Sequence, residues 1–392
     1  MSNKPRATAA TLLAAKSFRR RTLLKGALYT GTALSVGPFV LPRRALAAGE
    51  VNVFAWGDYA QTFQDHIIGG FEQETGIKVN LSTYGSNDEV ENKLRAAGGK
   101  GFDVIFPSVT NGPRYYPENL LQALDESRIN VDAIIPSIYR DTVTLGGTHR
   151  GSRYVIPWDW GTEGITFDSS QLPLEDSEVS FGSLWQPELT NAAAFRQKSV
   201  LFGVGLYLDA IGELPSNRML DFYANEDDAR RIFEACTKFI IDRKDNIGAF
   251  WNNATEATAA FTDAGCVIGQ TWDTTGILLG LEVDPKYKYR APKEGIITWV
   301  DGIAMPSGAE NIDQAIAFIN YILTPENGGA FANATGYNSC VAGAEEHLAE
   351  ANKQIFKEVY PPEVLDNLWW WQAEPPWMAP LQGQHAEQIT NA

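Results

Sequence analysis

Histidine and cysteine are scarce in this chain, which limits the chemistry that it could support. The 392 residues include four scattered histidines and three cysteines, none of them in a C-x-x-C pair. A histidine-based metal site, a zinc knuckle and a Ser-His-Asp triad are therefore not expected. No G-x-S-x-G, G-x-x-x-x-G-K-[ST] or H-E-x-x-H motif occurs, and no G-x-G-x-x-G opens a helix. We predict that the protein is not an enzyme and has no cofactor and no metal.

Basic residues are also few outside the first 47 positions. Residues 1–47 hold nine Lys and Arg and no Asp or Glu. Their removal would leave 23 basic residues against 48 acidic ones, a net charge of −25 compared with −16 for the whole sequence. Such acidity argues against nucleic-acid binding and would attract cations. The odd number of cysteines allows at most one disulfide within the chain, and buried thiols are the simpler expectation.

The first 47 residues have the three parts of an export signal. A basic region ends at Arg19–Arg21, an interrupted apolar stretch covers 27–41, and Ala45-Leu46-Ala47 has the A-x-A pattern of a cleavage site. The apolar stretch is too short for a membrane helix. The run R-R-T-L-L-K at 20–25 resembles the twin-arginine signal R-R-x-F-L-K, with leucine in place of the usual phenylalanine. We predict export by the twin-arginine translocase, cleavage near Ala47 and a periplasmic mature protein.

No internal repeat and no flexible linker divides the remaining chain, in which short strand and helix patterns alternate. The periodicity predicts strands at 51–55, 77–81 and 102–106, and helices at 59–75 and 89–97. Gly76 should end the first helix, and Ser86 or Asn87 should cap the second. Further strands are expected at 154–157, 267–270 and 296–301, and helices at 226–242 and 315–323. Such alternation builds a parallel sheet, which binds ligands where its strands end.

Tryptophan stands near a carboxylate at four places. The pairs are Trp56 with Asp58, Trp158 and Trp160 with Asp159 and Glu163, Trp272 with Asp273, and Trp299 with Asp301. Each pair falls at a predicted loop or strand end. An aromatic face attracts an ammonium group, and a carboxylate adds a charge-assisted hydrogen bond. The four pairs together favour a site for an organic amine, although a core tryptophan beside a solvated acid explains any single pair equally well.

Several segments carry a family resemblance. They read NVFAWGDY at 52–59, FDVIFPS at 102–108, IPWDWG at 156–161, PKEGIITWVD at 292–301, AFINYILTPE at 317–326 and GY at 336–337. In this order, after an export signal, they resemble the periplasmic spermidine/putrescine-binding proteins of ABC importers, within the family-1 extracellular solute-binding proteins. The similarity spans nearly all of residues 50–345.

The resemblance implies an α/β, two-lobed periplasmic-binding-protein fold. Each lobe would contain a mixed or parallel sheet flanked by helices, and the ligand cleft would lie between lobes that close by a hinge. The expected first lobe is 48–156 plus 301–345, and the second is 157–300 plus 346–392. The family pattern also implies ligand-binding roles for Trp56, Asp58, Tyr59, Ser108, Trp272, Trp299, Asp301 and Gln372.

The middle segment departs from the family pattern. The family usually has acidic residues there that hold ligand nitrogens, whereas residues 199–207 read SVLFGVGLY and contain no acid. Either Asp159 or Glu163 takes this role, or the ligand is not a linear polyamine. The tryptophans at 369–371 either pack as core or add a wall to the cleft.

We therefore predict a monomeric binding protein that captures a small organic solute, a polyamine in the first instance, and delivers it to the membrane permease of an ABC importer. The same role for a non-polyamine solute is the main alternative. A sensing protein that signals through a membrane partner would share the fold and the ligand. An exported glycosidase-like enzyme is a further alternative, since tryptophans stack on sugars and paired carboxylates can cleave glycosidic bonds.

Overall fold

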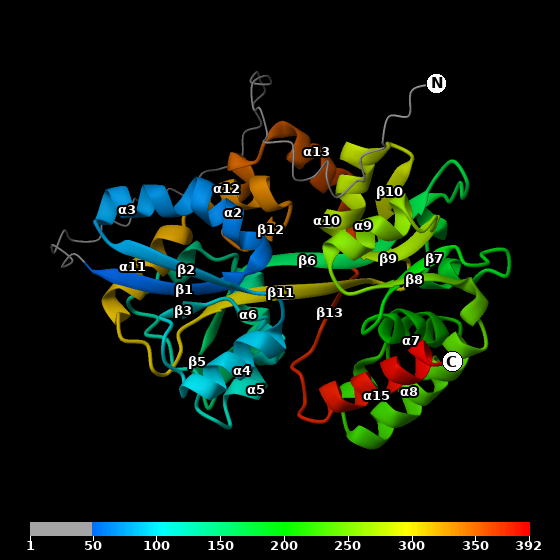
Figure 1. The fold of residues 1–392 in the computed structure, drawn as a ribbon, viewed down its shortest axis with the longest axis horizontal. Helices are drawn as coiled ribbons and strands as arrows, with labels where there is room; N and C mark the ends of the chain where they lie inside the picture. The colour runs from blue at the N-terminus through cyan, green and yellow to red at the C-terminus, as the bar shows by residue number, and fades with distance from the viewer. Residues whose placement is uncertain (1–48) are drawn as a thin grey trace, which may run out of the picture. The chain divides into compact units, whose positions relative to one another are not determined.

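One mixed sheet runs through residues 49–392, which are the residues that the structure, a computed structural model, describes. The predicted leader lies outside them. The strands follow the order β2-β1-β3-β11-β6-β9-β7-β8, and β10, β12 and β13 pair alongside this path. Figure 1 shows the helices gathered around the two ends of the sheet, with β6 and β11 running between them. Residues 48–392 form a unit of their own.

The first part of the sheet follows the predicted β-α-β pattern. Strands β1 (Glu50–Trp56), β2 (Lys78–Tyr84) and β3 (Val104–Ile105) are parallel. A continuous helical stretch of α2 (Ala60–Thr62), η2 (Phe63–Ile68) and α3 (Gly69–Thr75) ends at Gly76, whose φ of 72° suits glycine. Helix α4 (Asn87–Ala97) begins after Ser86, whose side chain accepts a hydrogen bond from the Glu89 N–H. Both predicted helix boundaries are confirmed.

Other elements complete the first part. They are α5 (Gly112–Tyr115), α6 (Pro136–Asp141), β4 (Thr148–His149), β5 (Ser152–Arg153), α11 (Ile312–Ile322), α12 (Pro325–Thr335) and β12 (Asn338–Ser339). Their apolar side chains form a first core with those of β1 and β3, and this core includes Phe54, Phe106 and Trp158.

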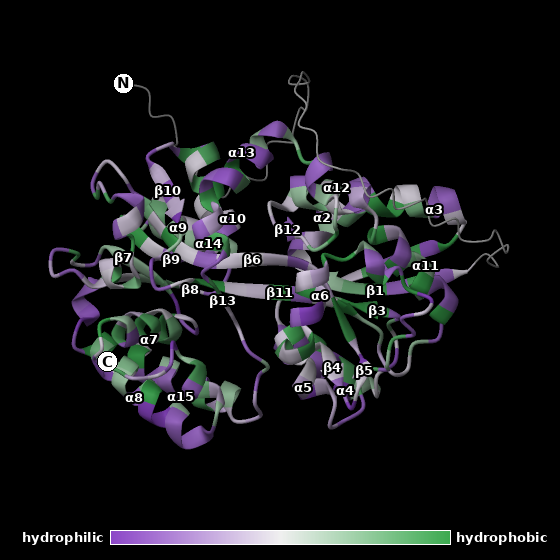
Figure 2. Ribbon diagram, turned by 180° about the vertical axis from the view of Figure 1, so that it is seen from behind, coloured by the Kyte–Doolittle hydropathy of each residue, from purple (hydrophilic) through white to green (hydrophobic). Residues whose placement is uncertain are grey.

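The second part of the sheet has its own core, which contains Phe195, Phe202 and Trp369. Its elements are β7 (Ala193–Arg196), α7 (Val200–Ala210), α8 (Glu226–Ile241), β8 (Ile247–Trp251), α9 (Ala254–Thr262), β9 (Ile268–Trp272), α10 (Asp273–Leu278), β10 (Tyr287–Arg290) and α15 (Met378–Thr390). Helices α13 (Glu350–Val359) and α14 (Pro362–Leu365) and strand β13 (Leu368–Trp370) lead into α15. In Figure 2 the helices carry both hydrophobic and hydrophilic residues, as amphipathic helices do.

Two long antiparallel strands, β6 (Val155–Asp168) and β11 (Ile296–Ala304), join the two parts. The strand predicted at 154–157 is too short, because β6 continues through residues 158–168. All fourteen residues of β6 are buried. A strand that is buried on both faces needs no alternation of polar and apolar residues, so its length was not visible in the pattern.

The three cysteines are free and buried, as the sequence favoured. Trp369 is also buried and packs near Phe202, which places it in the second core. Within residues 49–392 no helix combines the length and the apolar character needed to span a membrane.

Candidate ligand-binding site

Two carboxylates face each other where β6 and β11 pass between the two cores. Asp159 and Asp301 are register partners, so their side chains share one face of the sheet. The Tyr59 hydroxyl donates to Asp159 Oδ1 at 2.6 Å, and the Ser108 hydroxyl donates to Asp301 Oδ1 at 2.6 Å. No donor within the described residues reaches the buried Oδ2 atom of Asp159. An unpaired buried acceptor is costly, and a ligand N–H could satisfy it.

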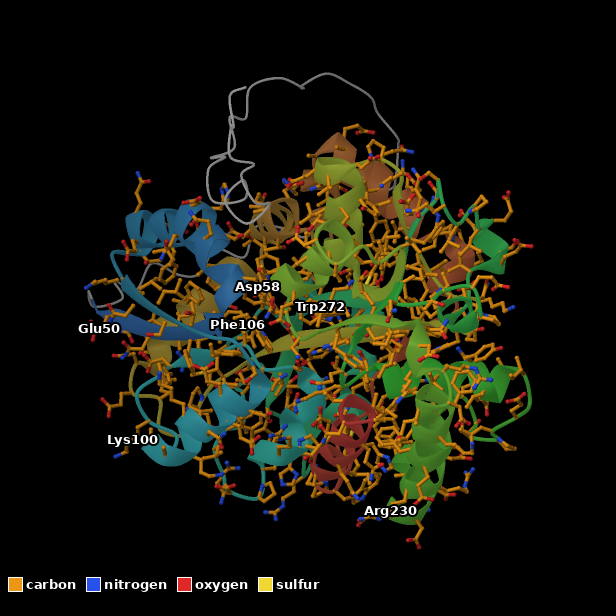
Figure 3. The ribbon with its side chains drawn as sticks, turned by 45° about the vertical axis from the view of Figure 1, so that its right-hand side comes forward. Glu50, Asp58, Lys100, Phe106, Arg230 and Trp272 are labelled. Atoms are coloured by element: carbon orange, nitrogen blue, oxygen red, sulfur yellow. The ribbon has the colours of Figure 1, made fainter. Side chains whose placement is uncertain are left out.

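Asp58 is the third carboxylate of this group. It lies in the helical turn Gly57–Tyr59 that follows β1, and it accepts a hydrogen bond from the Tyr337 hydroxyl at 2.6 Å. In Figure 3 the labelled Asp58 and Trp272 lie toward the middle of the molecule, whereas Glu50, Lys100 and Arg230 lie at its periphery. We call Asp58, Asp159 and Asp301 the aspartate cluster.

Aromatic rings stand beside the aspartate cluster. Trp299 lies two residues from Asp301 on the same face of β11, and its ring meets Tyr337 edge-on with centroids 5.1 Å apart. The Trp299 ring also lies against Gly161, where an added Cβ would come within 2.3 Å of Trp299 Cζ2. Trp56 packs against Tyr84 with centroids 4.8 Å apart. The cluster therefore combines negative charge with aromatic faces, which together suit an ammonium group.

The three carboxyls perturb one another. Burial raises the pKa of Asp301 to about 7. Burial, and then the charge of Asp301, raises the pKa of Asp159 well above its ordinary value. Asp58 is exposed to solvent, yet protein atoms surround it closely enough to desolvate the carboxylate and raise its pKa. The cluster thus resists full ionisation until a positive charge enters it.

Glu163 and Trp272 form a second group farther along β6. They are register partners, and the Arg196 guanidinium lies 4.8 Å from the Trp272 ring centroid. Glu163 is fully buried and accepts hydrogen bonds from the side chains of Ser199, Gln270 and Arg196. The structure therefore does not bring Glu163 into the aspartate cluster.

Gln372 also lies apart from the cluster. Its side-chain amide donates to the Trp370 carbonyl at 2.7 Å, within its own segment. In the described part of the chain no hydrogen bond joins it to the three aspartates. Trp371 packs against Phe202 with centroids 4.4 Å apart, beside the second core.

The other members of the tryptophan–carboxylate pairs, Trp158, Trp160 and Asp273, have structural roles. Trp158 is fully buried against Phe331, and Trp160 packs against Tyr360. Asp273 accepts hydrogen bonds from the Thr162 and Thr274 N–H groups and from the Tyr360 hydroxyl. The expectation that each pair lies at a loop or strand end is wrong for the pairs on β6 and β11, which lie within the strands.

Comparison with known proteins identifies the family. A family model described as "Bacterial extracellular solute-binding protein" matches residues 67–357, which is more than half of the chain. The chain belongs to the bacterial extracellular solute-binding proteins. This is a family of transport proteins and not of enzymes, and the solute-binding role accounts for the lack of catalytic motifs.

Two similar proteins illustrate the relationship. The chain is 28% identical to the spermidine/putrescine-binding periplasmic protein 1 of Haemophilus influenzae, over 83% of this chain and 85% of that protein. It also resembles the crystal structure of the spermidine/putrescine substrate-binding protein PotD of Streptococcus pneumoniae, with a TM-score of 0.70, 25% identity, and coverage of 88% of this chain and 99% of that one. These neighbours confirm the two-lobed α/β fold.

The same fold also accommodates other ligands. The binding protein AgtB of A. tumefaciens R10, solved in complex with agropinic acid, matches with a TM-score of 0.62 and 15% identity, over 87% of this chain and 99% of that one. This likeness concerns the fold alone. The ligand of the present solute-binding protein must therefore be argued from its own residues.

Two residues of the site were not assigned from the sequence. The Asn87 side chain donates to Ser108 Oγ at 2.9 Å and accepts from the Ser108 N–H at 3.1 Å, so it orients the serine that holds Asp301. The sequence presented Asn87 only as a helix cap. Tyr337 was visible in the Gly-Tyr segment of the resemblance, but nothing in the sequence linked it to Asp58.

Proposed function

We propose that this protein is the periplasmic binding protein of an ABC importer for a small aliphatic amine, with putrescine and spermidine as the first candidates. The observation that carries the proposal is the aspartate cluster, in which three carboxylates meet between aromatic rings. The ligand-binding residues would be Trp56, Asp58, Tyr59, Ser108, Asp159, Trp299 and Asp301, with Tyr337 added. Trp272 would line the far end of the site.

The physical chemistry of the cluster supports this choice. An ammonium donates up to three hydrogen bonds, and Asp159 Oδ2 is an acceptor without a partner in the described residues. Contact with an aromatic face adds ~0.5–2 kcal/mol per ring. The net charge of −25 expected after removal of the leader would also concentrate cations near the protein.

The names of the relatives support the same class of ligand. The H. influenzae and S. pneumoniae proteins are both described as binding spermidine and putrescine. We extend this ligand class, the membrane permease as partner, the periplasmic location and export by the twin-arginine translocase to the present chain as parts of the proposal. The two lobes would close over the ligand, and the closed monomer would dock on the permease.

A ligand panel tests this function. The mature protein, residues 48–392, is screened by thermal shift and titration calorimetry against putrescine, spermidine, monoamines, amino acids, sugars and dicarboxylates. An amine at about 100 times its Kd should stabilise the protein by about 2.7 kcal/mol. Stabilisation by a sugar or dicarboxylate but by no amine-bearing solute would contradict the amine assignment, and would leave the solute-binding role intact.

The affinity for amines should rise with pH. Because the pKa of Asp301 is about 7 and that of Asp159 is also raised, the free site holds protons at neutral pH. A bound ammonium requires ionised carboxylates, so binding releases these protons and is weakened wherever they are present. Between pH 6 and pH 8, each proton that binding releases should make the affinity rise by about tenfold per pH unit. Calorimetry in buffers of different ionisation enthalpy counts the protons, and identical heats in all buffers would argue against the mechanism.

A further inference from the structure

Arg196 lies at the end of the site nearer the second core. No carboxylate of the described residues is free to bind a ligand there. Arg196 is the last residue of β7, and 28% of its side-chain surface is exposed to solvent. The guanidinium lies over the Trp272 ring at 4.8 Å and near the Trp251 ring at 5.9 Å. It is therefore held by stacking on aromatic rings while part of it stays open to solvent.

Arg196 lies beside the face of the sheet that bears the aspartate cluster. Asp159, Gly161 and Glu163 alternate along β6, so they share this face, and Trp272 is the register partner of Glu163. The Cα atoms of Asp159 and Glu163 are separated by about 13 Å along the strand, from the rise per residue. The Trp299 ring lies over Gly161, between the two ends. The site is thus a strip with acids at one end, Trp299 in the middle, and Trp272 with Arg196 at the other end.

The Arg196 end offers donors and no free carboxylate to a ligand nitrogen. Its unpaired acceptor within the described residues is the neutral amide Oε1 of Gln270, which is buried. Glu163 is fully buried, and Ser199, Gln270 and Arg196 already donate to its oxygens. Arg196 uses one N–H for Glu163, and no other hydrogen bond of its guanidinium is found within residues 49–392. A guanidinium has five N–H donors and no acceptor. A second ammonium placed here would meet a like charge and no carboxylate able to receive it.

We infer that the ligand is an ω-amino carboxylate, with its ammonium in the aspartate cluster and its carboxylate on the free N–H groups of Arg196. A guanidinium binds a carboxylate through two parallel hydrogen bonds, which fixes both the orientation and the class of the ligand. The methylenes between the two ends would cross the Trp299 ring. This inference rests on the proposed function as an amine-binding protein, and it places amines that also carry a carboxylate ahead of putrescine and spermidine as candidate ligands.

The test compares ligands that differ only in one end group. Binding of 1,4-diaminobutane, 1,5-diaminopentane and 1,6-diaminohexane is measured by calorimetry against that of 4-aminobutanoate, 5-aminopentanoate and 6-aminohexanoate. At one chain length at least, the amino carboxylate should bind about tenfold more tightly than the diamine. Arg196→Gln should weaken the amino carboxylate by about tenfold without weakening the diamine. Arg196→Lys keeps the charge but not the paired donors, so its affinity for the amino carboxylate should lie between that of the parent protein and that of Arg196→Gln.

Arg243→Gln is the matched control, because the Arg243 guanidinium also lies over a ring, that of Phe239 at 3.8 Å, but on the exposed surface. This variant should bind both ligand classes as the parent protein does. If a diamine binds more tightly than the amino carboxylates, and Arg196→Gln leaves its affinity unchanged or improves it, the inference is overturned and the proposed function stands. Failure of both ligand series, with binding of a non-amine solute, would overturn both. Circular dichroism spectra confirm that the variants are folded.

Discussion

Asp301→Asn should weaken the binding of any amine ligand by about 30- to 1,000-fold, or roughly 2–4 kcal/mol. Asparagine keeps the shape of the side chain and can still accept the Ser108 hydrogen bond, so the change removes mainly the negative charge. The protein itself does not need that charge, because burial raises the pKa of Asp301 to about 7 and favours its neutral form. Calorimetry at pH 8, where the parent carboxyl is ionised, gives the loss of affinity directly.

The opposite behaviour is expected of Asp273→Asn. Asp273 is also buried, but Thr162, Thr274 and Tyr360 donate four hydrogen bonds to its oxygens, and none of these partners belongs to the aspartate cluster. An amide cannot accept all of these hydrogen bonds, so this change should lower the melting temperature and leave the affinity for amines close to that of the parent. If Asp301→Asn binds amines as tightly as the parent protein, or if both variants lose affinity equally, the aspartate cluster does not bind the ligand.

The β-α-β start of the fold could be predicted because its signals are local. Strand alternation, the glycine at position 76 and the cap at Ser86 all act within a few residues of the boundary that they set. The same logic failed for β6, in which Trp158 to Gly161 lie within a strand. Burial on both faces removes the alternation from which strand length is inferred.

The candidate site could be predicted only in part, because its contacts join distant segments. The Tyr59–Asp159 hydrogen bond spans 100 residues, and the Ser108–Asp301 hydrogen bond spans 193. The sequence offered each residue as a candidate through the resemblance and the tryptophan–carboxylate pairs, but only strand register places them on one face. Glu163 was a candidate that the structure does not bring into the cluster, because Ser199 and Gln270 already donate to its carboxylate. The sequence alone does not distinguish such a carboxylate from one that faces a ligand.

Gly161→Ala should weaken amine binding by about 10- to 100-fold, which corresponds to roughly 1–3 kcal/mol of overpacking. The new Cβ would lie 2.3 Å from Cζ2 and 2.9 Å from Cε2 of Trp299, so the ring must move. The backbone at Gly161 lies within a β-strand and accepts alanine without strain. Trp299 is partly exposed, and its ring would be displaced into the middle of the site, where the methylenes of the ligand are expected.

Gly69→Ala is the control for this change, because a Cβ at Gly69, on the exposed side of α3, has no neighbour within 4 Å. It should leave binding unchanged and stabilise the protein by about 0.4–1 kcal/mol. Because Trp299 lies between the two ends of the site, Gly161→Ala should weaken diamines, amino carboxylates and monoamines alike. Arg196→Gln should weaken only the ligands that carry a carboxylate. If Gly161→Ala instead spares one of these classes, that class does not cross Trp299, and the strip from the aspartate cluster to Arg196 is not its binding path.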